Sequence, residues 1–322
     1  MKRKAMALLI TVACILLLCL IVPLLIPLPP LEDTVPPQEL ADADSRFIEI
    51  DGMQFHYKIL GQGEPAIVLL HGFVSSVFTW RKVMPPLSEY GTVIAFDRPG
   101  FGLTERLLPD QWEAESPYSA EAHADQTIAL IEALGFEDAV LIGNSAGGSV
   151  ALDAARRYPE SVRALVLVDA AVYIQPGPPQ WVLPLLSSPQ GRRLGILLAR
   201  GIAKHGKPLL DLALHDSSGI ASEMWEGYTK PTHAVDWDTA FWELFLTTNP
   251  PHLEDCLEQV TIPVLVVSGD DDRVVPLEQS IRLADELPQA TLAIFEQCGH
   301  LPQEECPEAF LDAVINFLND LP

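Results

Sequence analysis

The stretch that decides the fold of this chain reads Gly143-Asn144-Ser145-Ala146-Gly147-Gly148-Ser149. It contains Gly-x-Ser-x-Gly, directly after the apolar residues 139–142 and directly before the helix-like residues 150–155. A chain that turns sharply from a strand into a helix at a serine strains that residue and exposes its Oγ. The neighbouring glycines are needed because the backbones approach too closely for a Cβ. The pattern alone is common, so the strand–turn–helix context is what makes it informative.

Short apolar runs alternate with helix-like segments on both sides of this heptad. The runs expected to be strands covered on both faces span residues 66–70, 92–96, 139–142, 164–168, 264–267 and 291–295. The expected helices span residues 121–134, 146–158, 277–287 and 307–318. Two further runs, 46–50 and 54–60, flank Asp51-Gly52 and predict a hairpin. The sequence therefore predicts an α/β fold with a mostly parallel sheet, an antiparallel N-terminal edge and helices on both faces.

The segment from about residue 171 to 236 interrupts this alternation and predicts a helical lid between two core strands. It is rich in leucine and proline, and its basic residues gather in 191–207. One interpretation is an ordinary amphipathic helix over the site, with its basic face solvated or paired to acidic residues. The other is a surface that rests on anionic lipid headgroups and admits lipid-like substrates.

The N-terminal residues 1–30 are set apart by composition. Lys2-Arg3-Lys4 precedes the apolar residues 5–28, and about 20 apolar residues suffice to cross a bilayer. The prediction is an uncleaved signal-anchor, a transmembrane helix with its N-terminus in the cytoplasm and the rest of the chain outside. A cleaved signal peptide, with secretion, is the alternative. Residues 31–45, rich in proline and acids, predict a stalk, and residues 46–322 the folded domain.

Charge and cysteine content exclude several classes of protein. The chain has 44 acidic and 20 basic side chains, a net charge of −24, which disfavours binding to nucleic-acid phosphates. Of the five cysteines, Cys14 and Cys19 lie in the apolar segment. The remaining Cys256, Cys298 and Cys306 are odd in number and lack metal-ligand spacing, so neither a disulfide framework nor a zinc site is expected.

A serine hydroxyl needs an imidazole to take its proton, and the imidazole needs an acid to orient it. His300 follows the predicted strand 291–295, and a loop at the carboxyl end of a strand is where an open α/β sheet places its site residues. The acid is expected among Asp270, Asp271 and Asp272, which follow the strand 264–267. The order serine, aspartate, histidine is that of the α/β-hydrolase arrangement.

From about residue 46 to its end the chain resembles the α/β-hydrolases, in particular lid-bearing serine hydrolases and esterases, ring-cleavage-product hydrolases and cofactor-free haloperoxidases. The motifs that carry the resemblance are His71-Gly72-Phe73, Asp97-Arg98-Pro99-Gly100-Phe101-Gly102, Gly143-Asn144-Ser145-Ala146-Gly147-Gly148, Gly269-Asp270-Asp271-Asp272-Arg273-Val274-Val275-Pro276 and Cys298-Gly299-His300. The resemblance implies that Ser145 is the nucleophile and His300 the general base. It also implies that Asp272 is the acid, because the family's acid stands four residues before the motif proline.

An oxyanion hole needs two donors aimed at the developing charge, and each contributes a factor of about 10²–10³ in rate. The resemblance implies the backbone N–H groups of Phe73 and Ala146. His71 and the turn 97–102 are expected to be structural. No cofactor or metal is expected, because the other histidines stand singly along the sequence, at positions 56, 123, 205, 215, 233 and 252.

The serine at the turn disfavours epoxide hydrolases and haloalkane dehalogenases, which carry an aspartate there. Hydrolysis of a carboxylic ester through an acyl-enzyme is the leading hypothesis. Carbon–carbon bond hydrolysis of ring-cleavage products is the first alternative, although Phe73-Val74-Ser75-Ser76 and Leu301 depart from that subfamily's pattern. A haloperoxidase-like side reaction stays open. A hypothesis of another class is a protein that binds a small ligand without turnover, which an acyl-serine probe would distinguish.

Overall fold

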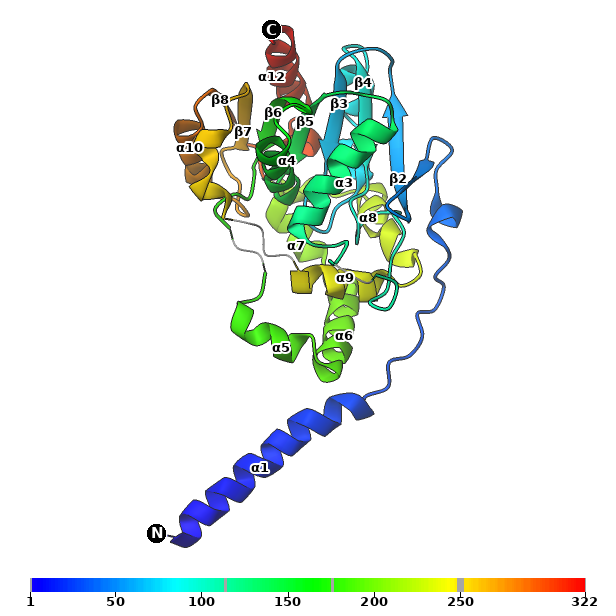
Figure 1. Ribbon diagram of the computed structural model, residues 1–322, viewed down its shortest axis with the longest axis vertical. Helices are drawn as coiled ribbons and strands as arrows, with labels where there is room; N and C mark the ends of the chain where they lie inside the picture. Colours follow the sequence, from blue (N-terminus) through cyan, green and yellow to red (C-terminus); the bar gives the residue numbers. More distant parts are fainter. Residues whose placement is uncertain (1, 113–114, 175–176, 248–251, 322) are drawn as a thin grey trace.

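An eight-stranded sheet forms the centre of the domain in the described part of the chain, with strand order β1-β2-β4-β3-β5-β6-β7-β8 (Figure 1). The computed structural model describes residues 2–112, 115–174, 177–247 and 252–321. The strands are β1 Arg46–Ile50, β2 Met53–Leu60, β3 Ala66–Leu70, β4 Thr92–Phe96, β5 Ala139–Asn144, β6 Val162–Val168, β7 Val264–Gly269 and β8 Ala290–Phe295. The pairs β1–β2 and β2–β4 are antiparallel and the others parallel. The predicted α/β fold, with its antiparallel N-terminal edge, is confirmed.

Helices cover both faces of the sheet. Alternating side chains of β3 face opposite layers, because Val68 and Leu70 belong to one buried cluster and Ile67 and Leu69 to the other. The first cluster includes residues of α3 (Ala120–Ala133), α4 (Ala146–Arg157) and α10 (Leu277–Glu286). The second includes residues of α2 (Met84–Leu87) and α12 (Pro307–Asn319). The central strands are apolar along most of their length because helices cover both faces of the sheet.

The last strand departs from the prediction. β8 was expected to be covered on both faces, yet its Leu292 and Ile294 are exposed. The physical reason is its position, because β8 is an edge strand that pairs only with β7 among the described strands. An apolar run indicates a strand but does not say whether that strand lies at the edge of its sheet.

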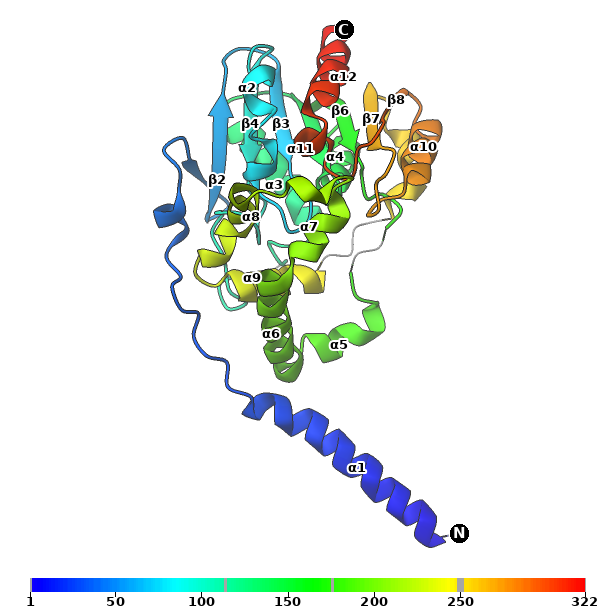
Figure 2. The same cartoon turned by 180° about the vertical axis from the view of Figure 1, so that it is seen from behind.

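A helical insertion lies between β6 and β7 and forms a lid on one end of the domain (Figures 1 and 2). Its helices are α5 Leu183–Leu186, α6 Pro189–His205, α7 Lys207–Ala213, α8 Ser222–Thr229 and α9 Trp237–Thr247. The insertion thus continues past residue 236, the end expected from the sequence, and residues 175 and 176 of that span lie outside the described residues.

The arginines of α6 have partners within the chain. Arg192 forms an ion pair with Glu243, and Arg200 pairs with Asp238 at 2.7 Å. Both acids lie on α9 and are buried. These contacts match the interpretation in which the basic face of the lid pairs with acidic residues, and they engage two of the charges that lipid headgroups were expected to bind.

The N-terminal residues form α1 (Lys2–Leu25), which extends away from the domain in both views (Figures 1 and 2). The membrane span predicted for residues 5–28 is not supported. Among the residues that the structure describes, no helix is both long and apolar enough to cross a bilayer. The helix ends at Leu25, with Pro23 inside it.

The expected stalk lies against the domain. Val35 forms a parallel β-bridge with Ala234 of the lid. Asp42 pairs with Lys58 at 2.8 Å and with Lys230 at 2.6 Å, so one acid joins the N-terminal segment to both β2 and the lid. Local composition favours an extended segment, but the sequence does not show that distant lysines stand ready to pair with it.

Candidate active site

Ser145 lies at the turn between β5 and α4, with φ +55° and ψ −120°. A non-glycine residue held at positive φ costs about 1–3 kcal/mol and persists only where the surroundings enforce it. The surroundings here are backbone. A Cβ on Gly147 would lie 2.2 Å from the carbonyl oxygen of Leu70, and one on Gly143 would lie 2.4 Å from that of Gly147. The close packing of β3, β5 and α4 therefore fixes the turn that presents Ser145.

His300 follows β8 and meets an aspartate from the loop after β7. Its Nδ1 lies 2.7 Å from Oδ2 of Asp272, and both side chains are less than 10 % exposed. Oδ1 of Asp272 accepts hydrogen bonds from the N–H groups of Val274 at 2.7 Å and Val275 at 2.9 Å. These donors hold the carboxyl group of Asp272 in one orientation.

The three adjacent aspartates have different surroundings. Asp272 alone points at His300 among them. Asp271 is half-buried and pairs with His215 at 2.8 Å, and hydrogen bonds from His215 and Arg273 lower the pKa of Asp271. Asp270 accepts from the N–H of Cys298 at 3.3 Å. The structure thus places Asp272 beside the histidine, where the resemblance had put it.

The serine turn and the histidine loop are held together. The side-chain amide of Asn144 donates to the carbonyl oxygens of His300 at 3.1 Å and Val168 at 3.2 Å. From the other side, the N–H of His300 donates to Ala213 of the lid at 2.8 Å. Ser145 and His300 both line one cavity, so the structure brings the predicted nucleophile and base to the same site.

The expected oxyanion donors flank Ser145. A Cβ on Gly72 would lie 3.2 Å from the Cβ of Ser145, so the loop that carries the Phe73 N–H passes directly beside the serine. Ala146 is the first residue of α4, and N–H groups in the first turn of a helix have no acceptor within that helix. The helix dipole adds partial positive charge at the same point. Both residues whose N–H groups were expected to form the oxyanion hole therefore lie beside Ser145.

The loop before Phe73 is held by a buried arginine. Arg98 donates from its backbone N–H to Nε2 of His71 at 3.1 Å, and its guanidinium donates to the carbonyl oxygens of His71 and Gly72. Burial, followed by the charge of Arg98, lowers the pKa of His71 to about 3. His71 is therefore neutral, and its Nδ1–H donates to the Gly72 carbonyl oxygen at 2.8 Å. These contacts describe a structural role.

Three of the histidines that stand singly along the sequence have a carboxylate partner in the folded chain. Carboxylates lie against their ring nitrogens in the pairs His56–Asp97 at 2.6 Å, His215–Asp271 at 2.8 Å and His252–Glu254 at 3.0 Å. The first two pairs join residues far apart in the sequence, which spacing along the chain does not reveal.

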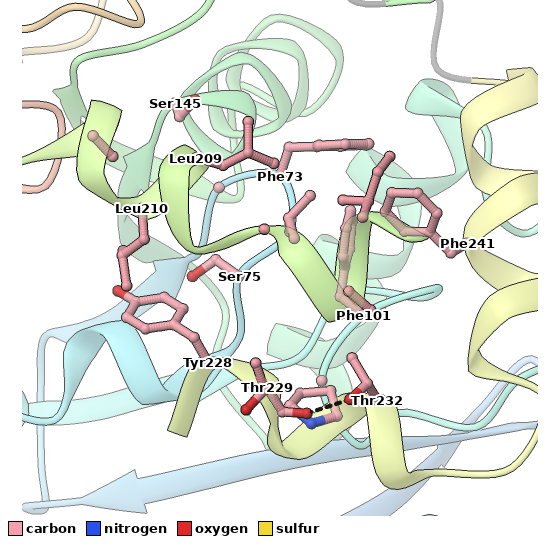
Figure 3. Close-up of a pocket in the computed structure, with 18 of the residues that line it drawn as sticks. Phe73, Ser75, Phe101, Ser145, Leu209, Leu210, Tyr228, Thr229, Thr232 and Phe241 are labelled. Carbon is pink, nitrogen blue, oxygen red and sulfur yellow. Dashed lines mark hydrogen bonds between the residues drawn. The ribbon is translucent and has the colours of Figure 1, made fainter. Parts of the chain in front are cut away.

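The cavity beside Ser145 has a volume of about 350 Å³. It lies between the carboxyl ends of the strands and the lid (Figure 3). Its wall is mainly apolar, and the larger contributors are Phe73, Phe101, Leu209, Leu210, Trp225, Trp237 and Phe241. Arg106 is the one lysine or arginine among the described residues that line it, and its guanidinium donates to the carbonyl oxygens of Thr104 and Gly102. The site is therefore a mainly apolar cavity with Ser145 in its wall.

A disulfide joins Cys298 to Cys306, with their Cα atoms 6.3 Å apart, and closes a loop around His300. The expectation that these cysteines form no disulfide is therefore wrong. Three cysteines outside the apolar segment leave the pairing open, and only the return of the chain at α11 (Pro302–Glu305) brings two of them together.

One buried carboxyl at the site was missed from the sequence. Asp169 directly follows β6 and is fully buried. A carboxylate oxygen of Asp169, one of Asp272 and a ring nitrogen of His300 all lie within 4.8 Å of one another. Three such groups could surround a metal ion, but Nδ1 of His300 is already bonded to Asp272, so the arrangement suits proton transfer. The available signal was position, because Asp169, like Ser145, comes shortly after a predicted strand.

Comparisons with known proteins agree with this geometry. A family model described as alpha/beta hydrolase fold matches residues 65–307. The "Uncharacterized hydrolase YugF" of Bacillus subtilis is 31 % identical over 277 residues, which cover 85 % of this chain and 97 % of that protein. A 2-hydroxymuconate semialdehyde hydrolase of a Pseudomonas species is 31 % identical over 267 residues, with coverage of 80 % and 88 %.

Two solved structures are similar along most or all of the chain. A meta-cleavage product hydrolase from Pseudomonas fluorescens has a TM-score of 0.67 and 26 % identity, and the match covers 86 % of this chain and 98 % of that one. A membrane phospholipase A described as a bacterial virulence factor has a TM-score of 0.68 and 24 % identity, with coverage of 100 % and 99 %. The second likeness shows the fold alone.

Proposed function

This chain belongs to the alpha/beta hydrolase fold family, and on that premise we propose that it is a serine hydrolase of carboxylic esters with apolar substituents. The observation that carries the proposal is the position of Ser145. Ser145 lines an apolar cavity that His300 also lines, and Nδ1 of His300 is hydrogen-bonded to the buried carboxyl group of Asp272.

In the proposed reaction His300 acts first as base and then as acid. Because Nδ1–H donates to Asp272, Nε2 is the nitrogen left to take the proton of the Ser145 hydroxyl. Oγ attacks the ester carbonyl, and the oxyanion accepts hydrogen bonds from the N–H groups of Phe73 and Ala146. His300 then gives its proton to the leaving alcohol. A water molecule activated by His300 releases the acid from the acyl-enzyme and restores Ser145.

The cavity supports an apolar acyl or alcohol group. Each buried methylene contributes about 0.8 kcal/mol of transfer free energy, so a wall of aromatic and leucine side chains favours longer apolar chains. A lipid-like ester is one substrate of this kind. The volume of about 350 Å³ matches a small-molecule substrate.

Carbon–carbon bond hydrolysis is the second candidate, and two observations favour it. Relatives at about 30 % identity carry names such as 2-hydroxymuconate semialdehyde hydrolase and 2-hydroxy-6-oxononadienedioate hydrolase, whose substrates are carboxylates. Arg106 supplies the cavity wall with a cation that a substrate carboxylate would meet. An ester without charge gains nothing from that guanidinium.

A labelling and turnover experiment on the full chain tests both. We expect a fluorophosphonate probe to label the wild type and a Ser88→Ala control, and not Ser145→Ala. We then expect kcat/KM to rise with acyl-chain length for p-nitrophenyl esters and to exceed that for a 2-hydroxy-6-oxo-dienoate. A faster dienoate would replace the ester proposal with the second candidate. Folded wild-type protein without label would leave a ligand-binding protein.

We also propose that the domain works outside the cytoplasm. The Cys298–Cys306 disulfide supports this, because disulfides persist in oxidising compartments and are rare in the cytosol. Thiol alkylation of the protein in intact cells is the test, and free thiols at both positions would contradict the proposal.

A further inference from the structure

Two carboxyl groups approach His300 from neighbouring strands. β6 and β7 are parallel and in register from Leu165↔Val264 to Val168↔Val267, so both end at the same edge of the sheet. Asp169 directly follows β6, with φ +45°, and Asp272 lies three residues beyond the end of β7. The proposed reaction uses only Asp272, which leaves a buried acid at the site unexplained.

The two carboxyls differ in the donors that face them. Oδ1 of Asp169 accepts from the Ser268 hydroxyl at 2.7 Å and from the Gly269 N–H at 3.3 Å. Its Oδ2 is buried and has no donor among the described residues. Both oxygens of Asp272 are occupied, by two backbone N–H groups and by His300. Asp272 is therefore better suited to carry the negative charge.

Two carboxylates this close and this dry are not both ionised, since like charges in a desolvated site repel strongly. Burial, then the charge of Asp272, raises the pKa of Asp169 well above its ordinary range. The close approach of the two carboxyl side chains acts in the same direction. The titratable groups beside Asp169 at this strand edge are Asp272 and His300, and its other contacts, from Ser268 and Gly269, are neutral donors.

We propose that Asp169 is a reserve acid, a positioning residue that holds a proton beside Asp272 and ionises to support His300 when the Asp272 carboxylate is removed. The inference rests on the proposed role of His300 as base. In the intact site Asp169 donates from Oδ2–H to Asp272 and fixes that carboxylate. When Asp272 is replaced by asparagine, Asp169 releases its proton to solvent, and its carboxylate becomes the acceptor within reach of the imidazole.

A double-mutant cycle on the full chain tests this with Asp169→Asn, Asp272→Asn and the double variant. We expect kcat/KM on the preferred ester to fall less than tenfold for Asp169→Asn, because the amide keeps a donor toward Asp272. We expect a loss of about 10²-fold for Asp272→Asn and about 10⁴-fold for the double variant, the size of loss known for a serine hydrolase without its acid. Activity in Asp272→Asn as low as in the double variant would overturn the proposal.

The pH profile separates this role from a merely structural one. Every variant is expected to show a rise in rate as His300 loses its proton. Asp272→Asn is expected to show a second rise as Asp169 loses its proton, and this second rise is absent from the double variant. An infrared spectrum of the wild type at neutral pH adds a measurement that needs no turnover. In the difference spectrum between wild type and Asp169→Asn, we expect the wild type to carry a carbonyl stretch of a protonated carboxylic acid that the variant lacks.

The two proposals fail in different ways. Wild type without fluorophosphonate labelling would end the serine-hydrolase proposal, and the infrared band would then still report the proton on Asp169. Labelled wild type without that band would end the reserve-acid proposal alone. Far-ultraviolet circular dichroism and thermal unfolding of each variant show that the fold is retained.

Discussion

At the scale of single residues, Gly147 decides whether the serine turn can form. It is the second residue of α4 and packs against the backbone of β3, with a Cβ position 2.2 Å from the Leu70 carbonyl oxygen and 2.6 Å from that of His71. Both obstacles are backbone atoms of a buried strand and its loop, which do not move aside. The glycine is therefore required by packing and not by its own φ.

We expect Gly147→Ala to destabilise the protein by about 1–3 kcal/mol or more, since overpacking against fixed backbone forces the helix away from the sheet. Gly201→Ala is the matched control, because Gly201 lies in the interior of α6 with no atom within 4 Å of its Cβ position. That control is expected to stabilise by about 0.5–1 kcal/mol. Urea unfolding of the two variants is the measurement, and an equal effect would contradict the packing argument.

The sequence places Ser145, His300 and a run of three aspartates after recognisable strands, and therefore at the same end of a parallel sheet. The choice of Asp272 among the three aspartates comes from the family resemblance. Asp169 also follows a predicted strand, but its role could not be assigned from that position alone. Its surroundings depend on β6 and β7 being neighbours in register, which is a property of the folded sheet.

At the scale of elements, the loop from Cys298 to Cys306 holds His300 by several independent contacts. The disulfide closes the loop, and the Glu305 carboxylate inside it accepts from the N–H groups of Gly299 at 2.7 Å, His215 at 3.0 Å and Asp216 at 2.8 Å. Because His215 and Asp216 belong to the lid, the same carboxylate ties the histidine loop to the lid.

We expect Cys306→Ser to lower the free energy of unfolding by about 2–3 kcal/mol, the chain-entropy contribution of a loop of this size. kcat is expected to fall as well, because the imidazole loses part of its support. Cys256→Ser is the control, since Cys256 is a free, half-buried thiol. Thermal unfolding with and without a reductant measures the effect. Equal sensitivity of the wild type and Cys306→Ser to the reductant would show that the disulfide does not contribute.

Most elements could be predicted, because a buried strand leaves an apolar run and a helix leaves caps and stops. The exceptions are physical. β8 is an edge strand with the composition of a central one, and the lid continues into α9 past the acidic Asp236 that was taken as its end. The disulfide depends on a turn at α11, which neither cysteine count nor spacing indicates.

At the scale of the whole molecule, buried groups of opposite kinds balance its response to acid. Burial, then the charge of Arg98, lowers the pKa values of His71 and His123, so the unfolded chain binds protons that the folded chain does not as the pH falls below about 6.5. Burial raises the pKa values of Asp169 and Glu304, so both carboxyl groups hold a proton more tightly in the folded state than in the unfolded chain. The first pair destabilises the fold in acid and the second stabilises it.

Between pH 6.5 and 5 the two pairs therefore act on the stability of the wild type in opposite directions. Asp169→Asn lacks the carboxyl group that binds this proton. As the pH falls through the same range, its free energy of unfolding is expected to decrease relative to that of the wild type by about 1.4 kcal/mol per pH unit. The sign follows because a raised carboxyl pKa contributes stability at low pH that is lost as pH rises. Denaturant titrations at several pH values compare the two proteins, and parallel curves would show that Asp169 is already ionised.

Some residues of the helix α6 line the cavity, and others contact the N-terminal segment. Ala199, Ile202 and Ala203 line the substrate cavity, while Arg193 and Arg200 reach the other way. Arg193 donates to the carbonyl oxygens of Pro23 and Ile26, and Arg200 to that of Pro29. The wall of the cavity is thus fastened to the N-terminal segment. Removal of residues 1–30 would eliminate these hydrogen bonds to α6. The substrate specificity measured on such a truncated protein would therefore reflect a cavity wall with less support.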